Sequence, residues 1–441
     1  LTDGKELEGA KLQVTDEDGK VVDSWTSGKE AHIIKEMVVG RKYTLTETKP
    51  ADGYVTAESI TFTIEDTAKP QKIEMKDDVT KVEISKTDIS GKELPGAKLT
   101  ILDKDGKTVE SWTSEEKPHY IEMLPIGEYT LREESAPDGY LIAEDVKFTV
   151  EDTGEIQKVE MKDDVPTGTI LINKNGEFLD KVTPLDSVGG WVSHLFQYVT
   201  GNLKDVTFEV YALEDVKAAD GESEDYYKKD ELVATITADD TGVAKVSGLP
   251  LGKYYVKEKA TVDGFVLDDK ARKIDLTYRD QDTAEVTYSA DWQNNRQKAE
   301  VEVVKKEKDS DRVLEGAVFA LCAKNDITGA DGKVILKADS VIEELATDKE
   351  GKLTFTADLP IGFEYYIKET TPAPGFATTN EVQEFKFEYE GADKEKVTYS
   401  FTFEDEPTVI EVTKTSLTDG KELEGAKLQV TCLLYTSPSP R

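Results

Sequence analysis

The chain has 441 residues, with 91 Asp and Glu against 55 Lys and Arg, and a formal net charge of −36. This charge repels phosphate, so we expect no nucleic-acid partner, and no apolar run approaches the ~18 residues that insert into a membrane. Two cysteines and three scattered histidines exclude a disulfide framework and a zinc site, so any chemistry must use Lys, Asp, Glu or Asn.

The chain is an array of internal repeats. Residues 1–15 recur letter for letter at 417–431, and equivalent residues of the first two copies lie 87 or 86 positions apart. Looser copies are marked by GKYYVKEKATVDGF and GFEYYIKETTPAPGF. Self-similarity at a regular period indicates a tandem array. We expect repeat one at 1–79, repeat two at 80–165, repeat three at 166–298, repeat four at 299–408, and the start of a truncated fifth repeat at 409–431.

The pattern within each repeat is that of an all-β domain. Short alternating runs such as KLTIL and YTLRE are separated by turn signals such as Asp105-Gly106 and Pro137-Asp138-Gly139. About seven strands in ~87 residues predict an antiparallel β-sandwich of immunoglobulin-like size. The fold class expected is therefore a tandem array of such sandwiches.

Two stretches depart from the repeat pattern. Repeat three carries an insertion near 177–204, in which a short amphipathic helix is predicted by the spacing of Val188, Val192, Leu195 and Val199. A satellite cluster capping the sandwich is favoured there over a ligand site. Residues 432–441 end the alternation and look like translated adapter sequence, so we expect a non-native tail; a natural disordered tail is the alternative.

Ionisable residues continue the apolar face of three strands in each full repeat. Alternate side chains of a strand share a face, so Lys86 lies on the face of Val82 and Ile84. The same alternation places inward lysines on first strands at Lys86, Lys174, Lys305 and Lys414. It places inward glutamates on a second strand at Glu47, Glu133, Glu258 and Glu369. The last strand carries an inward acid or amide at Asp77, Asp163, Asn294 and Asp405.

These inward groups need a joint explanation, because burying an unpaired charge is costly. One explanation is a buried lysine–carboxylate pair, whose desolvation offsets much of its Coulomb gain. The other explanation is a chemical reaction between the inward groups. Desolvation lowers the pKa of a lysine and raises that of a glutamate, so a neutral amine could attack an Asp or Asn carbonyl that the glutamic acid polarises. An Asp would lose water and Asn294 would lose ammonia. The alternation alone leaves both explanations open.

In combination the motifs resemble the collagen-adhesin B-type (CnaB-like) and SpaA-type pilin repeats of Gram-positive surface proteins. The resemblance rests on the lysine strand (ISKTD, VKKEK), the GAKL or GAVF segment, and the Tyr-x-(Leu/Val/Ile)-x-Glu strand. That strand runs into EESAPDGY at Glu133 and ETKPADGY at Glu47. The resemblance covers nearly all of 1–431 and implies prealbumin-like sandwiches that form intramolecular isopeptide bonds spontaneously.

Carried over residue by residue, the resemblance implies three such bonds: Lys86–Asp163 assisted by Glu133, Lys174–Asn294 with Glu258, and Lys305–Asp405 with Glu369. Repeat one is expected to lack its first strand, which leaves Glu47 and Asp77 as one half-site and Lys414 as the converse half-site. Repeat three departs from the family pattern because its segment KATVDGF has no proline.

The resemblance implies a stalk or shaft segment of an extracellular, cell-wall adhesin or pilin, with no cofactor and single-turnover bond formation as its only chemistry. The alternative is an adhesive module that binds host extracellular matrix proteins or glycans, and exposed aromatic residues in the insertion would favour it.

A hydrolase is disfavoured, because both carboxylates face a core and sugar hydrolysis needs an open cleft. A calcium-binding site is disfavoured, because an EF-hand loop with Gly19 at its sixth position would have Trp25 at its twelfth position, where a glutamate is needed. His32 and His119 are expected to be strand residues.

Overall fold

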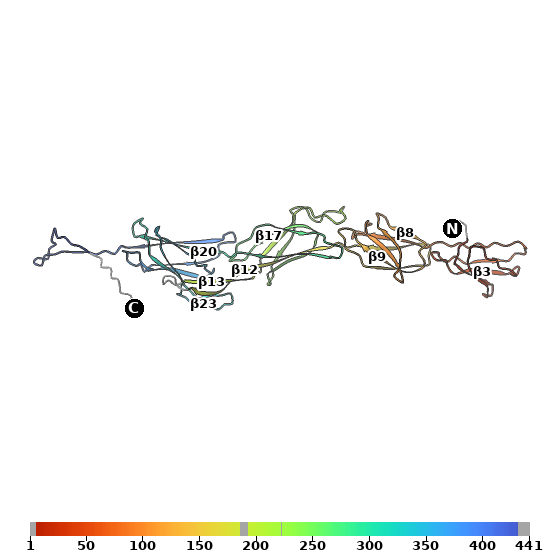
Figure 1. The fold of residues 1–441 in the computed structure, drawn as a ribbon, viewed down its shortest axis with the longest axis horizontal. Helices are drawn as coiled ribbons and strands as arrows, with labels where there is room; N and C mark the ends of the chain where they lie inside the picture. Colours follow the sequence, from red (N-terminus) through yellow and green to blue (C-terminus); the bar gives the residue numbers. More distant parts are fainter. Residues whose placement is uncertain (1–5, 186–192, 222, 431–441) are drawn as a thin grey trace, which may run out of the picture. The chain divides into compact units, whose positions relative to one another are not determined.

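A computed structural model describes residues 6–185, 193–221 and 223–430. Every regular element in these residues is a β-strand, as the alternating runs predict (Figure 1). No helix in the described residues is long and apolar enough to cross a membrane. The expectations for Val188, Val192 and the tail 432–441 lie outside the described residues.

The described residues form two compact units. The first contains the residues up to Lys174 together with 202–260 and 268–292. The second contains 175–201, 261–267 and the residues from Gln293 onward. Repeats one and two therefore lie wholly in the first unit, whereas repeat three contributes to both.

Repeat one contributes a single four-stranded sheet to the first unit, in the order β2-β1-β3-β4. Its strands are β1 (Lys11–Asp16), β2 (Val21–Thr26), β3 (Lys42–Lys49) and β4 (Ile60–Thr63). Its central cluster of buried apolar residues is small and consists of Val14, Tyr43 and Leu45.

Repeat two contains two sheets, in the orders β10-β9-β6-β7 and β11-β5-β8. Its strands are β5 (Lys81–Thr87), β6 (Lys98–Asp103), β7 (Thr108–Thr113), β8 (His119–Glu122), β9 (Gly127–Ser135), β10 (Val146–Val150) and β11 (Ile156–Lys162). One pairing differs from the antiparallel expectation: the first strand, β5, and the last, β11, are parallel neighbours. A buried core that includes Leu99, Ile101 and Leu131 fills the repeat.

The part of repeat three in the first unit has the sheet β15-β14-β17-β18, and β12 pairs with both β16 and β19. The strands are β12 (Thr167–Leu185), β14 (Thr207–Ala212), β15 (Leu232–Thr237), β16 (Val243–Pro250), β17 (Gly252–Ala260), β18 (Arg272–Leu276) and β19 (Glu285–Gln293). Residues of β12 beyond Lys174 belong to the second unit.

In the second unit, the part of β12 beyond Lys174 belongs to the strand order β12-β13-β24-β21-β26-β27, and the other sheets are β25-β20-β28 and β22-β23. Its strands are β13 (Ser193–Asn202), β20 (Lys298–Glu307), β21 (Val318–Ala323), β22 (Ile327–Thr328), β23 (Val334–Leu336), β24 (Val341–Ala346), β25 (Lys352–Phe355), β26 (Glu364–Thr371), β27 (Val382–Lys386) and β28 (Lys396–Asp405). As in repeat two, the first and last strands of repeat four, β20 and β28, are parallel neighbours.

The insertion of repeat three is not helical where it is described. Residues 193–202 form strand β13, whose Ser193 pairs with Glu343 of β24. Phe196 is buried in one core cluster with Val301 and Phe319, whereas Leu195 and Val199 of the predicted apolar helical face are exposed. For the described residues of the insertion the helix prediction was therefore wrong, and Phe196 packs in the second unit's core and not in a satellite cluster.

Candidate functional site

Lys86 of repeat two lies in the core of its sandwich. β5 is the central strand of its sheet, and the side chains of Val82, Ile84 and Lys86 alternate inward, as the sequence pattern predicts. Only 1% of Lys86 is exposed to solvent. A lysine in this position is nearly removed from water, so its charge must be neutralised or matched locally.

Two buried carboxyl groups surround the Lys86 amine. Nζ contacts Oδ1 of Asp163 and lies 3.1 Å from Oε1 of Glu133. Lys86 pairs with Met161 in the parallel register of β5 and β11, so Asp163 follows directly after the neighbouring strand. Glu133 reaches the amine from β9, in the other sheet of the sandwich. The lysine and aspartate therefore meet along one sheet, and the glutamate meets them from the facing sheet.

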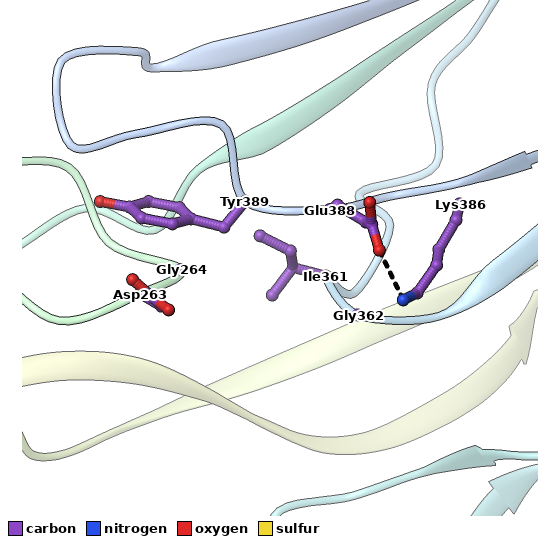
Figure 2. Close-up of a pocket in the computed structure, with 7 residues that line it drawn as sticks. All are labelled: Asp263, Gly264, Ile361, Gly362, Lys386, Glu388 and Tyr389. Atoms are coloured by element: carbon purple, nitrogen blue, oxygen red, sulfur yellow. Dashed lines mark hydrogen bonds and ion pairs between the residues drawn. The ribbon is translucent and has the colours of Figure 1, made fainter.

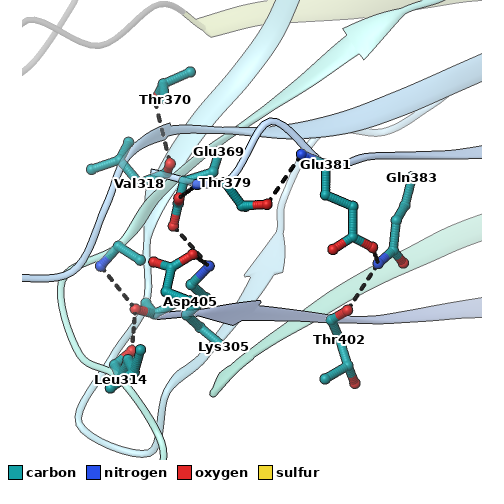
Figure 3. A network of polar contacts seen from close by, with 12 residues as sticks. Lys305, Leu314, Val318, Glu369, Thr370, Thr379, Glu381, Gln383, Thr402 and Asp405 are labelled. Atoms are coloured by element: carbon teal, nitrogen blue, oxygen red, sulfur yellow. Dashed lines mark hydrogen bonds and ion pairs between the residues drawn. The ribbon is translucent and has the colours of Figure 1, made fainter. Parts of the chain in front are cut away.

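Repeat four repeats this arrangement in the second unit. Figure 3 shows Lys305 of β20 between Asp405 of β28 and Glu369 of β26. Nζ of Lys305 contacts Oδ1 of Asp405 and lies 3.0 Å from Oε1 of Glu369, and all three residues are buried. Two repeats with different surrounding sequences thus bring the predicted lysine, acid and glutamate into direct contact.

Each of these glutamates is fixed by a backbone amide that the sequence analysis did not identify. The amide of Ala143 donates to Oε2 of Glu133 over 2.7 Å, and that of Thr379 donates to Oε2 of Glu369 over 3.1 Å. Oε1 of each glutamate is thereby directed toward the lysine. The donor follows its glutamate by ten residues in both repeats, and this constant spacing is a signal that could have revealed it.

Burial shifts the pKa of three of the predicted site residues, Asp163, Glu369 and Lys174, toward the neutral form. It raises the pKa of Asp163 to about 7, although the neighbouring Lys86 acts in the opposite direction. It also raises the pKa of Glu369 and lowers the pKa of Lys174. A neutral amine is a nucleophile and a neutral carboxylic acid is an electrophile, so the direction of the shifts favours amide formation.

Repeat three places its predicted residues in two different units. In the first, Nζ of Lys174 lies 2.7 Å from Oε2 of Glu258 and over the ring of Phe208, 5.7 Å from its centre. Both Lys174 and Glu258 are buried. Asn294 belongs to the second unit, where it is buried and its amide donates to the hydroxyl of Thr261 over 2.9 Å.

Repeat one brings together the two carboxyl groups of the predicted half-site. Glu47 and Asp77 are both buried, and the amide of Ala57 donates to Oε2 of Glu47 over 2.7 Å, again ten residues downstream. Burial raises the pKa of Glu47 to about 7 and also raises the pKa of Asp77; the negative charge of Asp77 adds to the shift of Glu47. No ion pair links either group to a described lysine or arginine.

We expect repeat one to lose stability as the pH rises from about 4.5 to about 7. In this window the folded state binds more protons than the unfolded state, because the pKa of Glu47 is raised from 4.5 to about 7, and stability then falls with rising pH. The four methionines provide the measurement. Methyl NMR during urea unfolding reports repeat one through Met37 and Met75 and repeat two through Met123 and Met161. The repeat-one midpoint is expected to be lower at pH 8 than at pH 5.

The variant Glu47→Gln provides the control for this pH effect, because glutamine does not titrate. Its Met37 and Met75 signals are expected to lose most of the pH dependence. An equal dependence in both chains would contradict the assignment to Glu47.

Other features of the described residues offer no second site. The hollow in Figure 2 lies between Gly264 and Ile361. Of its three charged residues, Lys386 and Glu388 pair with each other over 2.5 Å, and the third is Asp263. No cluster of possible metal ligands occurs among the described residues. His119 begins β8, as expected, whereas His32 lies outside the strands. Both of these histidines stack on a tryptophan, His32 on Trp25 and His119 on Trp112.

Comparison with known proteins identifies one family model. The model for SpaA, a prealbumin-like fold domain, matches residues 1–79, 80–165, 197–292 and 299–404. No curated protein matches the chain.

Several solved structures are similar to parts of the chain. The Bacillus anthracis TIE protein is 20% identical, with 91% of this chain and 69% of that chain covered and a TM-score of 0.49. BcpA, the major pilin subunit of Bacillus cereus, is 15% identical, with 75% and 99% covered and a TM-score of 0.30. The shaft pilin SpaA from Lactobacillus rhamnosus GG is 18% identical, with 56% and 100% covered and a TM-score of 0.22. These similarities are too low to indicate a function.

Proposed function

Because the chain belongs to the SpaA family of prealbumin-like fold domains, we propose that it is a stalk or shaft segment of a Gram-positive cell-surface adhesin or pilin. Its repeats are stabilised by autocatalytic bonds between Lys86 and Asp163, Lys305 and Asp405, and Lys174 and Asn294. The proposal places the segment outside the cell, at the cell wall.

One observation supports this proposal above the others. The Lys86 amine is almost completely buried and contacts an aspartate and a glutamate at the same time. A buried ion pair alone is a weak source of stability, because desolvation offsets most of its Coulomb energy. The recurrence of the same three groups around Lys305 is better explained by a reaction that the contact promotes.

The reaction balances without an external reactant. Nζ of Lys86, as the free amine, attacks Cγ of Asp163 while the carboxylic acid of Glu133 donates a proton to the carbonyl oxygen. A C–N bond forms, a proton passes from the nitrogen to Glu133, and the C–O bond breaks. Asp163 reacts as the carboxylic acid, so the intermediate carries two hydroxyl groups. One of them takes a proton from Glu133 and leaves as water, and the proton of the other returns to Glu133 as the amide carbonyl forms, so Glu133 ends in its original protonation state. At Asn294 the leaving group is ammonia.

The bond would carry tension around the fold of repeat two. β5 enters the repeat and β11 leaves it, and Lys86 and Asp163 lie 77 residues apart in the sequence. An amide between them places a short covalent path between the two strands. Unlike a disulfide it resists reduction, which suits a chain with two cysteines.

The adhesive-module alternative receives no support from the described residues of the insertion. The described aromatic residues there are Phe178, Phe196 and Tyr198, and all are buried or half-buried. Tyr198 is covered by the guanidinium group of Arg296, 3.5 Å from the ring centre. A host-binding surface would instead present such residues to solvent.

Intact mass spectrometry of the denatured chain tests the proposed bonds. The wild-type mass is expected to fall short of the sequence mass by two waters and one ammonia. Lys86→Ala is expected to restore one water, and peptide mapping to find Lys86 joined to Asp163 in the wild type only. Lys98→Ala, which removes an exposed lysine of the same repeat, serves as the matched control and is expected to keep every deficit. A wild-type mass equal to the sequence mass would overturn the proposal.

A further inference from the structure

A short segment of repeat two connects its reacting groups to repeat three. Residues 141–143 precede β10 and donate three consecutive backbone amides to three different partners. The amide of Ala143 holds Oε2 of Glu133, as described above. The amide of Leu141 donates over 2.8 Å to the carbonyl of Asp164, the residue that follows the reacting aspartate. The segment therefore fixes both the glutamate and the backbone beside the aspartate.

The middle amide of this segment donates to repeat three. The amide of Ile142 donates to the carbonyl of Gln281 over 3.0 Å, and the side chain of Gln281 accepts the amide of Ala136 over 2.9 Å. Gln281 lies in the loop between β18 and β19, and all these residues belong to the first unit. One residue of repeat three therefore binds near both ends of the connection that runs from Glu133 to Ala143.

A second side chain of the same loop supports this contact. The hydroxyl of Tyr278 donates to the carbonyl of Tyr140 over 3.1 Å, and Tyr140 is itself buried. Backbone groups that lose water in such a contact need protein partners, so the donors and acceptors of the two repeats determine how the connection lies. Three hydrogen bonds thus hold the connection of repeat two against one loop of repeat three.

The contact recurs between successive repeats. In repeats one, two and three, the backbone amide nine positions after the inward glutamate donates to the following repeat. The acceptor lies each time in the loop before the last strand of that repeat. The donor and acceptor pairs are Thr56–Asp152, Ile142–Gln281 and Leu267–Ala392, over 2.8, 3.0 and 2.9 Å. Because the acceptor residues differ while the donor position is constant, the contact is a property of the fold.

The segment 141–143 is consequently held from two sides. Leu141 and Ala143 donate within repeat two, whereas Ile142 between them donates to repeat three. Loss of the contact with repeat three would leave the segment held on one side only, and Glu133 would be less firmly placed against the amine. Reactions between positioned groups depend steeply on placement, since a displacement of about 1 Å can cost about 100-fold in rate.

We propose that the docked loop of repeat three positions the site of repeat two, and that Gln281 is a positioning residue for the bond between Lys86 and Asp163. The inference rests on the function proposed above, and the bonds that form and break are those given there. Gln281 acts through the segment that holds Glu133 and takes no part in the proton transfers. The bond of repeat two is then expected to form efficiently only after repeat three has folded against it.

Time-resolved mass spectrometry during cell-free synthesis of the full chain tests this proposal. Samples are denatured in acid at successive times, and peptide mapping gives the linked fractions of Lys86–Asp163 and Lys305–Asp405 in the same molecules. The repeat-four bond serves as an internal clock. Gln281→Leu removes the acceptor for Ala136, and its repeat-two bond is expected to form about tenfold more slowly relative to the clock, the factor of one hydrogen bond. An unchanged ratio of the two rates would overturn the proposal.

Two further variants of the same loop distinguish positioning from general packing. Gln281→Glu retains a side-chain oxygen that accepts the amide of Ala136, so the wild-type ratio is expected to return. A ratio as low as that of Gln281→Leu would contradict the assigned hydrogen bond. Arg279→Ala changes an exposed residue two positions away and is the matched control, with the wild-type ratio expected.

A more conservative variant makes the test independent of misfolding. Tyr278→Phe retains the ring and removes only the hydroxyl that donates to Tyr140, and it is expected to slow the repeat-two bond relative to the clock by a factor of a few. The methyl signals of Met123 and Met161 report whether repeat two is folded in each variant. A folded Tyr278→Phe chain with the wild-type ratio would contradict the role of the docked loop.

The same samples separate this inference from the function proposed above. If the wild-type chain never forms the bond between Lys86 and Asp163, the shared chemistry is refuted. If the bond forms in the wild type and at the same rate in Gln281→Leu, only the positioning role is refuted, and the proposed stalk function is unaffected.

Discussion

Glu133→Gln is expected to lower the free energy of unfolding of repeat two by about 4.5 kcal/mol. The substitution retains the size of the side chain but removes the acid that assists the bond, so Lys86 and Asp163 remain unlinked. A cross-link that closes a loop of 77 residues restricts the unfolded chain by about this amount in the chain-entropy description. The loss would be a large fraction of the stability of a domain of this size.

The methyl groups of the four methionines again provide the measurement. In urea, the signals of Met123 and Met161 are expected to change at a lower concentration in Glu133→Gln than in the wild type. Met37 and Met75, in repeat one, serve as internal controls, and their signals should change at the same urea concentration in both chains. Glu134→Gln changes the exposed neighbour on the same strand and is the matched control variant. If Glu133→Gln lacks the water deficit yet unfolds like the wild type, the bond contributes nothing to stability.

Single-molecule pulling is expected to show almost no extension from repeats two and four. With the bonds in place, the chain between Lys86 and Asp163 and the chain between Lys305 and Asp405 carry no tension. These segments span 77 and 100 residues, so about 250–280 Å and about 330–360 Å of extended chain do not contribute to the measured extension.

In the variant Glu133→Gln, repeat two is expected to unfold in a new step that extends the chain by about 250–280 Å. The step from repeat four should remain absent, because Glu369 is unchanged in that chain. Glu134→Gln should behave as the wild type. Full extension of repeat two in the wild type, at the force that unfolds it in Glu133→Gln, would show that no covalent path exists between β5 and β11.

The inward position of the key residues could be predicted because strand alternation is a local property. Lys86, Glu133 and Asp163 each follow two apolar residues at a spacing of two, and each is buried as that spacing predicts. The alternation of side chains along a strand does not predict which strands are neighbours in a sheet. The parallel pairing of β5 and β11, which brings Lys86 and Asp163 together along one sheet, is decided by the packing of the whole repeat.

The insertion shows where a local pattern was misleading. Val188, Val192, Leu195 and Val199 have helical spacing, but Leu195 and Val199 are exposed on β13 while Phe196 between them is buried. A short apolar pattern cannot distinguish helix from strand when the decisive contact is distant in sequence. Here Phe196 packs in a cluster with Val301 and Phe319, more than a hundred positions away.

The parallel course of β5 and β11, and of β20 and β28, has a consequence for how such proteins change length in evolution. A polypeptide that enters and leaves a domain in the same direction can gain or lose whole domains without reversing the course of its neighbours. Identical stretches such as 1–15 and 417–431 are the substrates that unequal recombination needs. Genes for this architecture can therefore be lengthened or shortened by whole repeats.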